Sequence, residues 1–265
     1  MQMKIATETA DRAVQGLKRL SYTSEVDGAV DWAMMLRADE AATKCANVNA
    51  DVWVINLHGH GSTGDQLYTR QDIRKNWLPY MVDEGYSIIT PNLRGNAWMS
   101  PAAVADLHGL IVYLREHEGA KQFVLVSGSM GGTGSLIYAT QRPTDIAGVV
   151  ALCPATDLPG YLEWTTGHLD HPVIKQIHDA ICASYEHDAQ AIASYSVLAQ
   201  ADQLTMPVCV IHGDDDVAIP VEQARQLAKA MAGREQFLYR ELASGNHDAP
   251  LWEMAEALAW VRERM

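Results

Sequence analysis

The sequence predicts an α/β fold, in which a mostly parallel, doubly wound sheet carries helices on both faces. From residue 51 onward, short apolar runs alternate with longer amphipathic segments, as expected of strands buried beneath helices. A hairpin pattern precedes this alternation and would add antiparallel strands at one edge of the sheet. The chain has 265 residues, a length that one domain of this class can accommodate.

The N-terminal part differs from the rest. Residues 1–20 combine helical spacing with mixed charge, which predicts a helix. Residues 19–38 alternate in polarity and predict two strands joined at Asp27 and Gly28, a dipeptide that tolerates the positive φ angles of a tight turn. We therefore expect a hairpin next to the parallel part of the sheet.

The repeating part supplies the remaining elements. We expect strands at residues 51–57, 86–92, 121–127, 146–154, 206–213 and 236–242, and helices at 72–85, 100–119, 131–142, 221–233 and 250–265. We expect right-handed crossovers between these strands. Because parallel strands run in one direction, their carboxyl ends lie at one edge of the sheet, where α/β proteins carry their chemistry.

The alternation breaks at residues 155–205, which have the pattern of helix and loop. We expect this segment to form a helical lid over the strand ends, inserted within a single domain that covers residues 1–265. An ordinary long crossover between two strands is the alternative.

Composition restricts the partners. The formal net charge of −13 disfavours nucleic acid and anionic lipid, so a small molecule is the expected ligand. No apolar run reaches the roughly 18 residues that span a bilayer, and the N-terminus lacks a signal-peptide pattern. The cysteines, at positions 45, 153, 182 and 209, form no closely spaced pair. We expect a cytoplasmic protein without cofactor or membrane association, and self-association stays open.

Ser129 is the candidate nucleophile. It follows an apolar strand and precedes a helix, and a serine on so sharp a turn needs small residues two positions away on either side. Gly131 meets this need, whereas Ser127 stands where glycine is usual. In this geometry the backbone N–H of Met130 would point at a developing oxyanion.

The same glycines allow a second interpretation. Gly128, Gly132 and Gly134 approximate the glycine fingerprint of short-chain dehydrogenases. Those enzymes carry that loop after the first strand and need a Tyr-x-x-x-Lys pair, yet no tyrosine here is followed by lysine at the fourth position. The dehydrogenase interpretation is therefore disfavoured.

An acid and a base follow later in the chain. Asp214, Asp215 and Asp216 come directly after the strand at 206–213, where a carboxylate can orient a histidine. His247 lies on the short loop between the last strand and the last helix. The order serine, acid, histidine is the one that this type of serine enzyme requires.

A glycine-rich turn follows the strand at 51–57. In the run His58-Gly59-His60-Gly61, the N–H of His60 is the expected second oxyanion donor beside that of Met130. A metal held by His58 and His60 is disfavoured because the adjacent loop offers no acidic or cysteine ligand.

Together these motifs resemble the α/β-hydrolase superfamily, and residues 195–220 look like the catalytic domains of the prolyl-oligopeptidase and dienelactone-hydrolase groups. The resemblance implies an α/β-hydrolase fold with Ser129, Asp216 and His247 as the catalytic triad. Asp216 is singled out because it matches the Asp of the family pattern H-G-x-x-D-x-x-[VI]-P. Dienelactone hydrolase activity is not implied, since it uses a cysteine nucleophile.

The expected function is therefore a carboxylic ester hydrolase that works through an acyl-enzyme. Trp98, Tyr161 and Trp164 are expected to form an apolar wall for the substrate, with core packing as the alternative role. A peptidase or amidase with the same triad is a second hypothesis. A non-catalytic ligand-binding protein on the same fold is a third.

Overall fold

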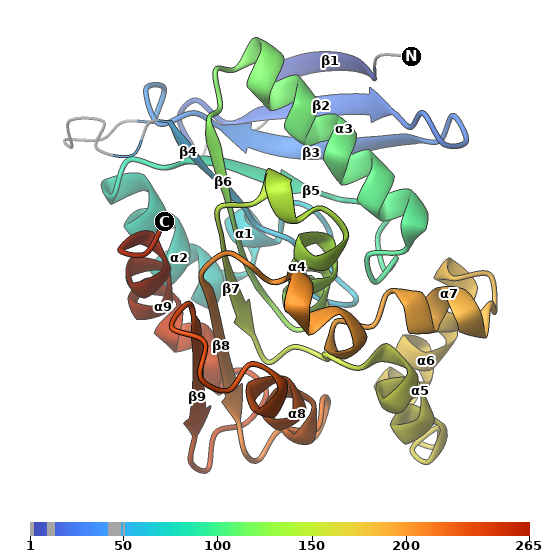
Figure 1. The fold of residues 1–265 in the computed structure, drawn as a ribbon. Coiled ribbons are helices and arrows are strands. Elements are labelled where there is room, and N and C mark those ends of the chain that lie inside the picture. The colour runs from blue at the N-terminus through green and yellow to red at the C-terminus, as the bar shows by residue number, and fades with distance from the viewer. Residues whose placement is uncertain (1–2, 10–13, 42–48, 50) are drawn as a thin grey trace.

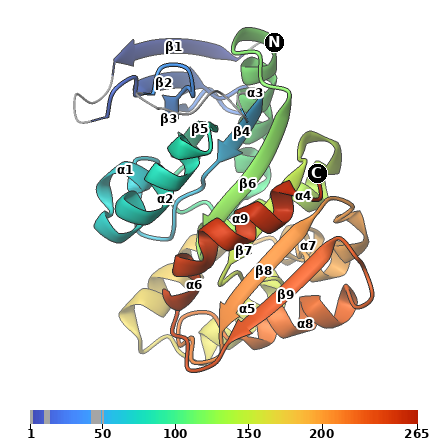
Figure 2. The ribbon, with the colours of Figure 1, turned by 90° about the vertical axis from the view of Figure 1, so that its left-hand side faces the viewer.

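The computed structural model describes residues 3–9, 14–41, 49 and 51–265. In this part of the chain nine strands form one sheet, in the order β1-β2-β3-β5-β4-β6-β7-β8-β9 (Figures 1 and 2). The strands are β1 (Lys4–Thr9), β2 (Lys18–Thr23), β3 (Val30–Leu36), β4 (Val52–Ile55), β5 (Ser87–Pro91), β6 (Gln122–Gly128), β7 (Gly148–Leu152), β8 (Val208–Gly213) and β9 (Phe237–Leu242).

The sheet has an antiparallel and a parallel part. Strands β1, β2, β3 and β5 pair antiparallel in that order, whereas β5, β4, β6, β7, β8 and β9 pair parallel. The predicted hairpin is confirmed, because β2 pairs with β3 and Gly28 has a φ of 76° in the turn between them. The predicted α/β class with a mostly parallel sheet is also confirmed.

The expected N-terminal helix is wrong. Residues 4–9 form β1 instead, which pairs with β2 over six residue pairs from Lys4–Thr23 to Thr9–Lys18. Pairing with β1 satisfies the outer backbone groups of β2, which would otherwise face solvent as an open edge. This long-range contact overrides the local helical spacing.

Helices cover both faces of the sheet (Figures 1 and 2). One face carries α3 (Pro101–His117), α4 (Met130–Gln141) and α8 (Glu222–Ala230), whose buried side chains join the larger hydrophobic core. The other face carries α1 (Gln66–Thr69), α2 (Gln71–Asp83) and α9 (Met254–Arg262), which form a second core with the strands. The central strands β4, β5, β7 and β8 are therefore buried on both sides, as their apolar sequences require.

The segment 155–205 forms a group of helices after the carboxyl end of β7 (Figure 1). It contains α5 (Leu158–Thr166), α6 (Pro172–Ser184), α7 (Ala189–Ser194) and a 3₁₀ stretch at Leu198–Gln203. On α6, Ile174, Ile177 and Ile181 share one face of the helix and are buried in the larger core. This packing joins the helical segment to the rest of the domain.

Within the described residues, no helix combines the length and the apolar character that crossing a membrane requires.

Candidate active site

Ser129 sits on a strained turn between β6 and α4. Its φ of 58° lies in the left-handed region, which a non-glycine residue adopts at some cost. The turn needs glycine behind it, because a Cβ on Gly131 would lie 2.2 Å from the Leu57 carbonyl oxygen and one on Gly132 would lie 2.9 Å from that of Leu152. Without side chains at these positions, the turn packs directly against the backbone of Leu57 and Leu152.

The unusual Ser127 has a structural explanation. Its side chain is fully buried, and its Oγ accepts a hydrogen bond of 2.9 Å from the backbone N–H of Leu57. Glycine at this position could not make that bond. Ser127 therefore ties the start of the His58–Gly61 loop to the strand that carries Ser129.

Asp216 lies on the loop after β8, and both of its carboxylate oxygens are hydrogen-bonded. Oδ1 accepts from the backbone N–H groups of Ala218 at 2.8 Å and Ile219 at 3.0 Å. Oδ2 faces His247 Nδ1 at 2.6 Å and His212 Nε2 at 3.0 Å. Burial raises the Asp216 pKa, but the bonds from His212 and His247 outweigh burial and hold this pKa below its usual range.

The neighbouring aspartates contribute backbone hydrogen bonds to the same loop. Asp214 and Asp215 are exposed, and their backbone N–H groups donate to the carbonyls of Leu242, at 3.1 Å, and Gly245, at 2.9 Å. These bonds hold the loop after β8 against the loop after β9. Of the three aspartates, the structure brings Asp216 to the predicted histidine.

His247 lies on the loop after β9 and joins the other two residues. Its Nδ1 faces Asp216, and its Nε2 lies 2.9 Å from Ser129 Oγ. With Nδ1–H donated to the carboxylate, Nε2 is free to accept the hydroxyl proton. Burial lowers the pKa of His247, but the Cys153 thiol group and the Asp216 carboxylate outweigh burial and raise this pKa above its usual value.

The loop after β4 approaches the same point. A Cβ on Gly59 would lie 4.0 Å from the Cβ of Ser129. The N–H groups of Gly59 and Gly61 donate to Gln66 Oε1 and Asn96 Oδ1, at 2.9 and 2.8 Å. The backbone N–H groups of His60 and Met130 donate to no acceptor in the described part of the chain. These two donors are free to bind an oxygen placed beside Ser129.

The His60 side chain is held by its neighbours. Trp98 Nε1 donates to His60 Nδ1 at 3.3 Å, which leaves the proton of a neutral ring on Nε2. Burial, and to a smaller extent His58, lower the pKa of His60. The ring therefore brings no positive charge to the site near neutral pH.

The three aromatic residues expected to form a substrate wall lie elsewhere. Trp98 and Tyr161 are 1% and 0% exposed and belong to the larger core, where their ring centroids are 5.8 Å apart. Trp164 is half-buried and stacks on Tyr161 and His168. None of the three lines the cavity next to Ser129.

That cavity has a volume of about 190 Å³. Its apolar lining comes from both sides of the sheet edge, with Ile73 and Trp77 on α2, Val173 and Ile177 on α6, and Leu251 after the histidine loop. Gln66, Arg70 and Asp248 supply polar groups at the same cavity. Arg70 is paired with Asp248 at 3.0 Å, which fastens the residue after His247 to the start of α2.

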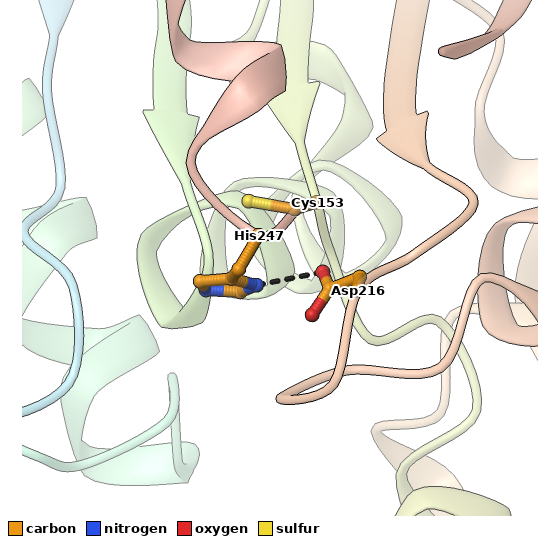
Figure 3. A group of neighbouring side chains, drawn as sticks. All are labelled: Cys153, Asp216 and His247. Atoms are coloured by element: carbon orange, nitrogen blue, oxygen red, sulfur yellow. Dashed lines mark hydrogen bonds and ion pairs between the residues drawn. The ribbon is translucent and has the colours of Figure 1, made fainter. Parts of the chain in front are cut away.

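Two residues of the site were missed from the sequence. His212 is the first residue of the pattern H-G-x-x-D-x-x-[VI]-P and was given no role there, yet it bonds the carboxylate of Asp216. Cys153 was assigned to a buried strand, but it follows the end of β7 with a φ of 45° and lies beside His247 (Figure 3). The signal that could have found Cys153 is its place at the carboxyl end of a central strand.

Comparisons with known proteins agree with this architecture. The family model described as BD-FAE matches residues 43–231. The chain is 24% identical over 229 residues to a thermostable monoacylglycerol lipase from Bacillus sp. (strain H-257), covering 77% of this chain and 88% of that protein.

Two solved structures illustrate the shared fold. The esterase Pf2001 of Pyrococcus furiosus superposes with a TM-score of 0.67 at 16% identity, covering 95% of this chain and 92% of that one. A putative dipeptidyl aminopeptidase IV from Bacteroides ovatus superposes with a TM-score of 0.72 at 14% identity, covering 95% of this chain and 36% of that one. The fold is that of the α/β-hydrolases, as the sequence motifs predicted.

Proposed function

The chain belongs to the BD-FAE family, and we propose that it hydrolyses carboxylic esters through an acyl-enzyme on Ser129. The observation that carries this proposal is the continuous path from Ser129 Oγ to His247 Nε2, at 2.9 Å, and from His247 Nδ1 to Asp216 Oδ2, at 2.6 Å. The Bacillus relative is named for hydrolysis of monoacylglycerol, which is an ester, and this supports the same bond class here.

In the proposed reaction, Ser129 Oγ attacks the ester carbonyl carbon while His247 Nε2 accepts the hydroxyl proton. The Asp216 carboxylate stabilises the imidazolium that forms. His247 then gives the proton to the departing alcohol, which leaves an acyl group on Ser129. Water attacks this acyl group with His247 again as base, and release of the acid restores the serine.

The N–H groups of His60 and Met130 serve as oxyanion donors in this proposal. Both are free of other acceptors in the described residues, and Met130 also lies at the N-terminus of α4, where the helix dipole favours negative charge. Loss of one such donor typically raises the barrier by about 2.7–4 kcal/mol.

The cavity supports a small ester as substrate. Its volume of about 190 Å³ lies below the roughly 300–1,000 Å³ of sites for drug-sized ligands. Trp77 lines this space and is fixed there, because its Nε1 donates to the Leu251 carbonyl at 2.7 Å. We therefore assign the cavity to a short or compact acyl or alcohol group.

The test compares hydrolysis of p-nitrophenyl acetate with that of aminoacyl p-nitroanilides. The proposal expects ester turnover that is lost in Ser129→Ala and retained in Ser135→Ala, whose hydroxyl bonds the Gly131 carbonyl within the same helix. Faster turnover of the anilides would favour a peptidase or amidase. A chain that neither turns over esters nor reacts at Ser129 with a fluorophosphonate would be a ligand-binding protein.

We also propose that residues 155–205 act as a lid that limits substrate size within a single domain. Val173 and Ile177 of α6 line the cavity, whereas Ile181 on the same helix does not. Ile177→Ala should therefore raise the rate ratio of p-nitrophenyl butyrate to acetate, and Ile181→Ala should leave it near that of the wild type. Equal ratios in the two variants would argue against the lid.

The cytoplasm is the proposed site of action. The described cysteines Cys153, Cys182 and Cys209 are all free thiols, which supports a reducing compartment. Fractionation of the native host cells, with ester activity followed in each fraction, tests this location.

A further inference from the structure

A thiol lies against the proposed catalytic histidine. Cys153 follows β7, and its backbone N–H donates to the Ile211 carbonyl at 2.8 Å, which fixes the residue at the end of the sheet. Only 1% of the residue is exposed, yet it lines the cavity that contains Ser129. Figure 3 shows its side chain next to the His247 ring, on which Asp216 also converges. This thiol takes part in no step of the proposed ester hydrolysis.

The three side chains present different ligand atoms to one point. The Cys153 sulfur, a ring nitrogen of His247 and a carboxylate oxygen of Asp216 all lie within 4.8 Å of one another. Thiolate, imidazole and carboxylate are the ligands of zinc in proteins, at bond lengths of about 2.0–2.3 Å. Tetrahedral binding at these lengths separates ligand atoms by roughly 3.3–3.7 Å. Small side-chain rotations would therefore bring all three atoms to a metal.

We propose that Cys153, Asp216 and His247 form an inhibitory site for a thiophilic divalent cation such as Zn²⁺. The three residues come from the loops after β7, β8 and β9, so neighbouring strand ends hold them together. Because Cys153 and His247 line the cavity, the cation can enter from there and keep a water in its fourth position. The inhibitory effect depends on the proposed esterase function, whereas cation binding does not.

Binding would disable the base in a defined way. The cation takes the lone pair of His247 Nδ1, the nitrogen that faces Asp216, and the Cys153 thiol loses its proton to solvent. The single proton of the neutral ring then resides on Nε2, which faces Ser129 Oγ. A protonated Nε2 cannot accept the serine proton. No bond to substrate forms or breaks, and no electron is transferred.

The hydrogen bonds of Asp216 set the strength of this site. Its Oδ1 is held by two backbone N–H groups, and its Oδ2 also accepts from His212 Nε2. The carboxylate is thus oriented before a cation arrives, while the thiol and the imidazole make the adjustment. The thiolate then selects softer cations, so Mg²⁺ should not bind here.

The first experiment measures p-nitrophenyl acetate hydrolysis in metal-buffered Zn²⁺, with each variant compared to its own metal-free rate. We expect inhibition of the wild type and of Cys182→Ala, which removes the thiol near His178 on α6. Inhibition of Cys153→Ala should need roughly 100-fold more Zn²⁺, because even hydrogen-bond partners of metal ligands contribute about 10–100-fold in affinity. Equal sensitivity of Cys153→Ala and the wild type would overturn the proposal.

The second experiment measures binding without activity. Co²⁺ added to the folded wild type and to Ser129→Ala should produce a thiolate-to-cobalt charge-transfer absorption in both. The absorption should be absent in Cys153→Ser, which keeps the size of the side chain. Such an absorption in a wild type that hydrolyses no ester would refute the proposed function and leave the cation site standing. Its absence from the wild type at inhibiting concentrations would refute the site.

Discussion

In the described part of the chain, two aspartates each face the Nδ1 atom of a histidine at nearly the same distance. His247 Nδ1 lies 2.6 Å from Asp216 Oδ2, and His108 Nδ1 lies 2.8 Å from Asp145 Oδ2. His108 even borders a larger hollow, of about 430 Å³, although none of the described residues that line it is a serine or a cysteine. The contact alone therefore does not identify a catalytic pair.

The difference lies in what else reaches each carboxylate. Asp145 also binds Arg115 Nη1 at 2.8 Å and the Tyr138 hydroxyl at 2.9 Å, so a permanent cation balances its charge. The described partners of Asp216 are two histidines and two backbone N–H groups, none of which is permanently charged. The negative charge of Asp216 thus remains available to stabilise an imidazolium. One pair is arranged to hold helices together, and the other faces a serine.

Replacing each histidine by alanine should give the largest difference in kcat between the two pairs. His247→Ala should lower kcat by roughly 10⁵–10⁶-fold, because removal of the proposed base would disable the proposed triad as a unit. His108→Ala should keep kcat within about twofold of the wild type, because His108 does not line the cavity that contains Ser129. Steady-state hydrolysis of p-nitrophenyl acetate measures both. A comparable loss of kcat in the two variants would show that the two histidine–aspartate pairs do not differ in this way.

The carboxylates should differ almost as strongly. Asp216→Asn should lower kcat by roughly 10⁴-fold, because an amide favours the wrong tautomer of the histidine. Asp214→Asn and Asp215→Asn serve as matched controls on the same loop and should keep turnover within a few-fold of the wild type. Circular dichroism checks that all three variants are folded. Loss of turnover in a control, with Asp216→Asn active, would move the acid to another residue.

Asp145 should matter for stability although it does not matter for turnover. Asp145→Asn should lower the free energy of unfolding by about 2 kcal/mol at pH 7, because hydrogen bonds to a charged group contribute about 1.5–3 kcal/mol. Its kcat should be unchanged. The exposed Asp170→Asn is the control and should shift stability by less than about 0.5 kcal/mol.

Acid titration checks the cause of that loss. Burial raises the Asp145 pKa, but bonds from Arg115, His108 and Tyr138 outweigh burial and lower it. A lowered pKa in the folded state gives stability that is complete above the unfolded pKa of about 3.9 and is lost as pH falls through the folded value. The difference between wild type and Asp145→Asn in urea unfolding should therefore shrink below about pH 4. A difference that stays constant down to pH 2 would exclude this cause.

The sequence predicted the parts of this site that depend on position along the chain. Strand ends are recognisable from apolar runs, and Ser129, the aspartates and His247 each follow one. Because parallel strands bring their carboxyl ends to one edge, chain order was enough to expect these residues together. The choice of Asp216 among three aspartates came from a family pattern, and in the structure it is this aspartate that contacts His247.

The features that the sequence did not predict depend on packing between distant segments. Trp98 and Tyr161 are large aromatic residues, as a substrate wall would need. They are nevertheless buried in the larger core, because other elements pack over them. Strand β1 exists because β2 offers it an open edge. The bond from Leu57 to Ser127, like the place of Cys153 beside His247, joins segments far apart in sequence. Local patterns contain no information on such contacts.

The smallest expected effect concerns His212, the second histidine that contacts Asp216 Oδ2. Its fully buried ring shares Nε2 between Asp216 Oδ2 and the Ile219 carbonyl, while its Nδ1 has no partner among the described residues. His212→Phe should lower kcat about tenfold with KM unchanged, the equivalent of one lost hydrogen bond to a charged group. His212→Gln, which restores an N–H donor, should recover part of that loss. If His212→Phe instead raised KM at constant kcat, His212 would shape the cavity and would not be a positioning residue for the acid.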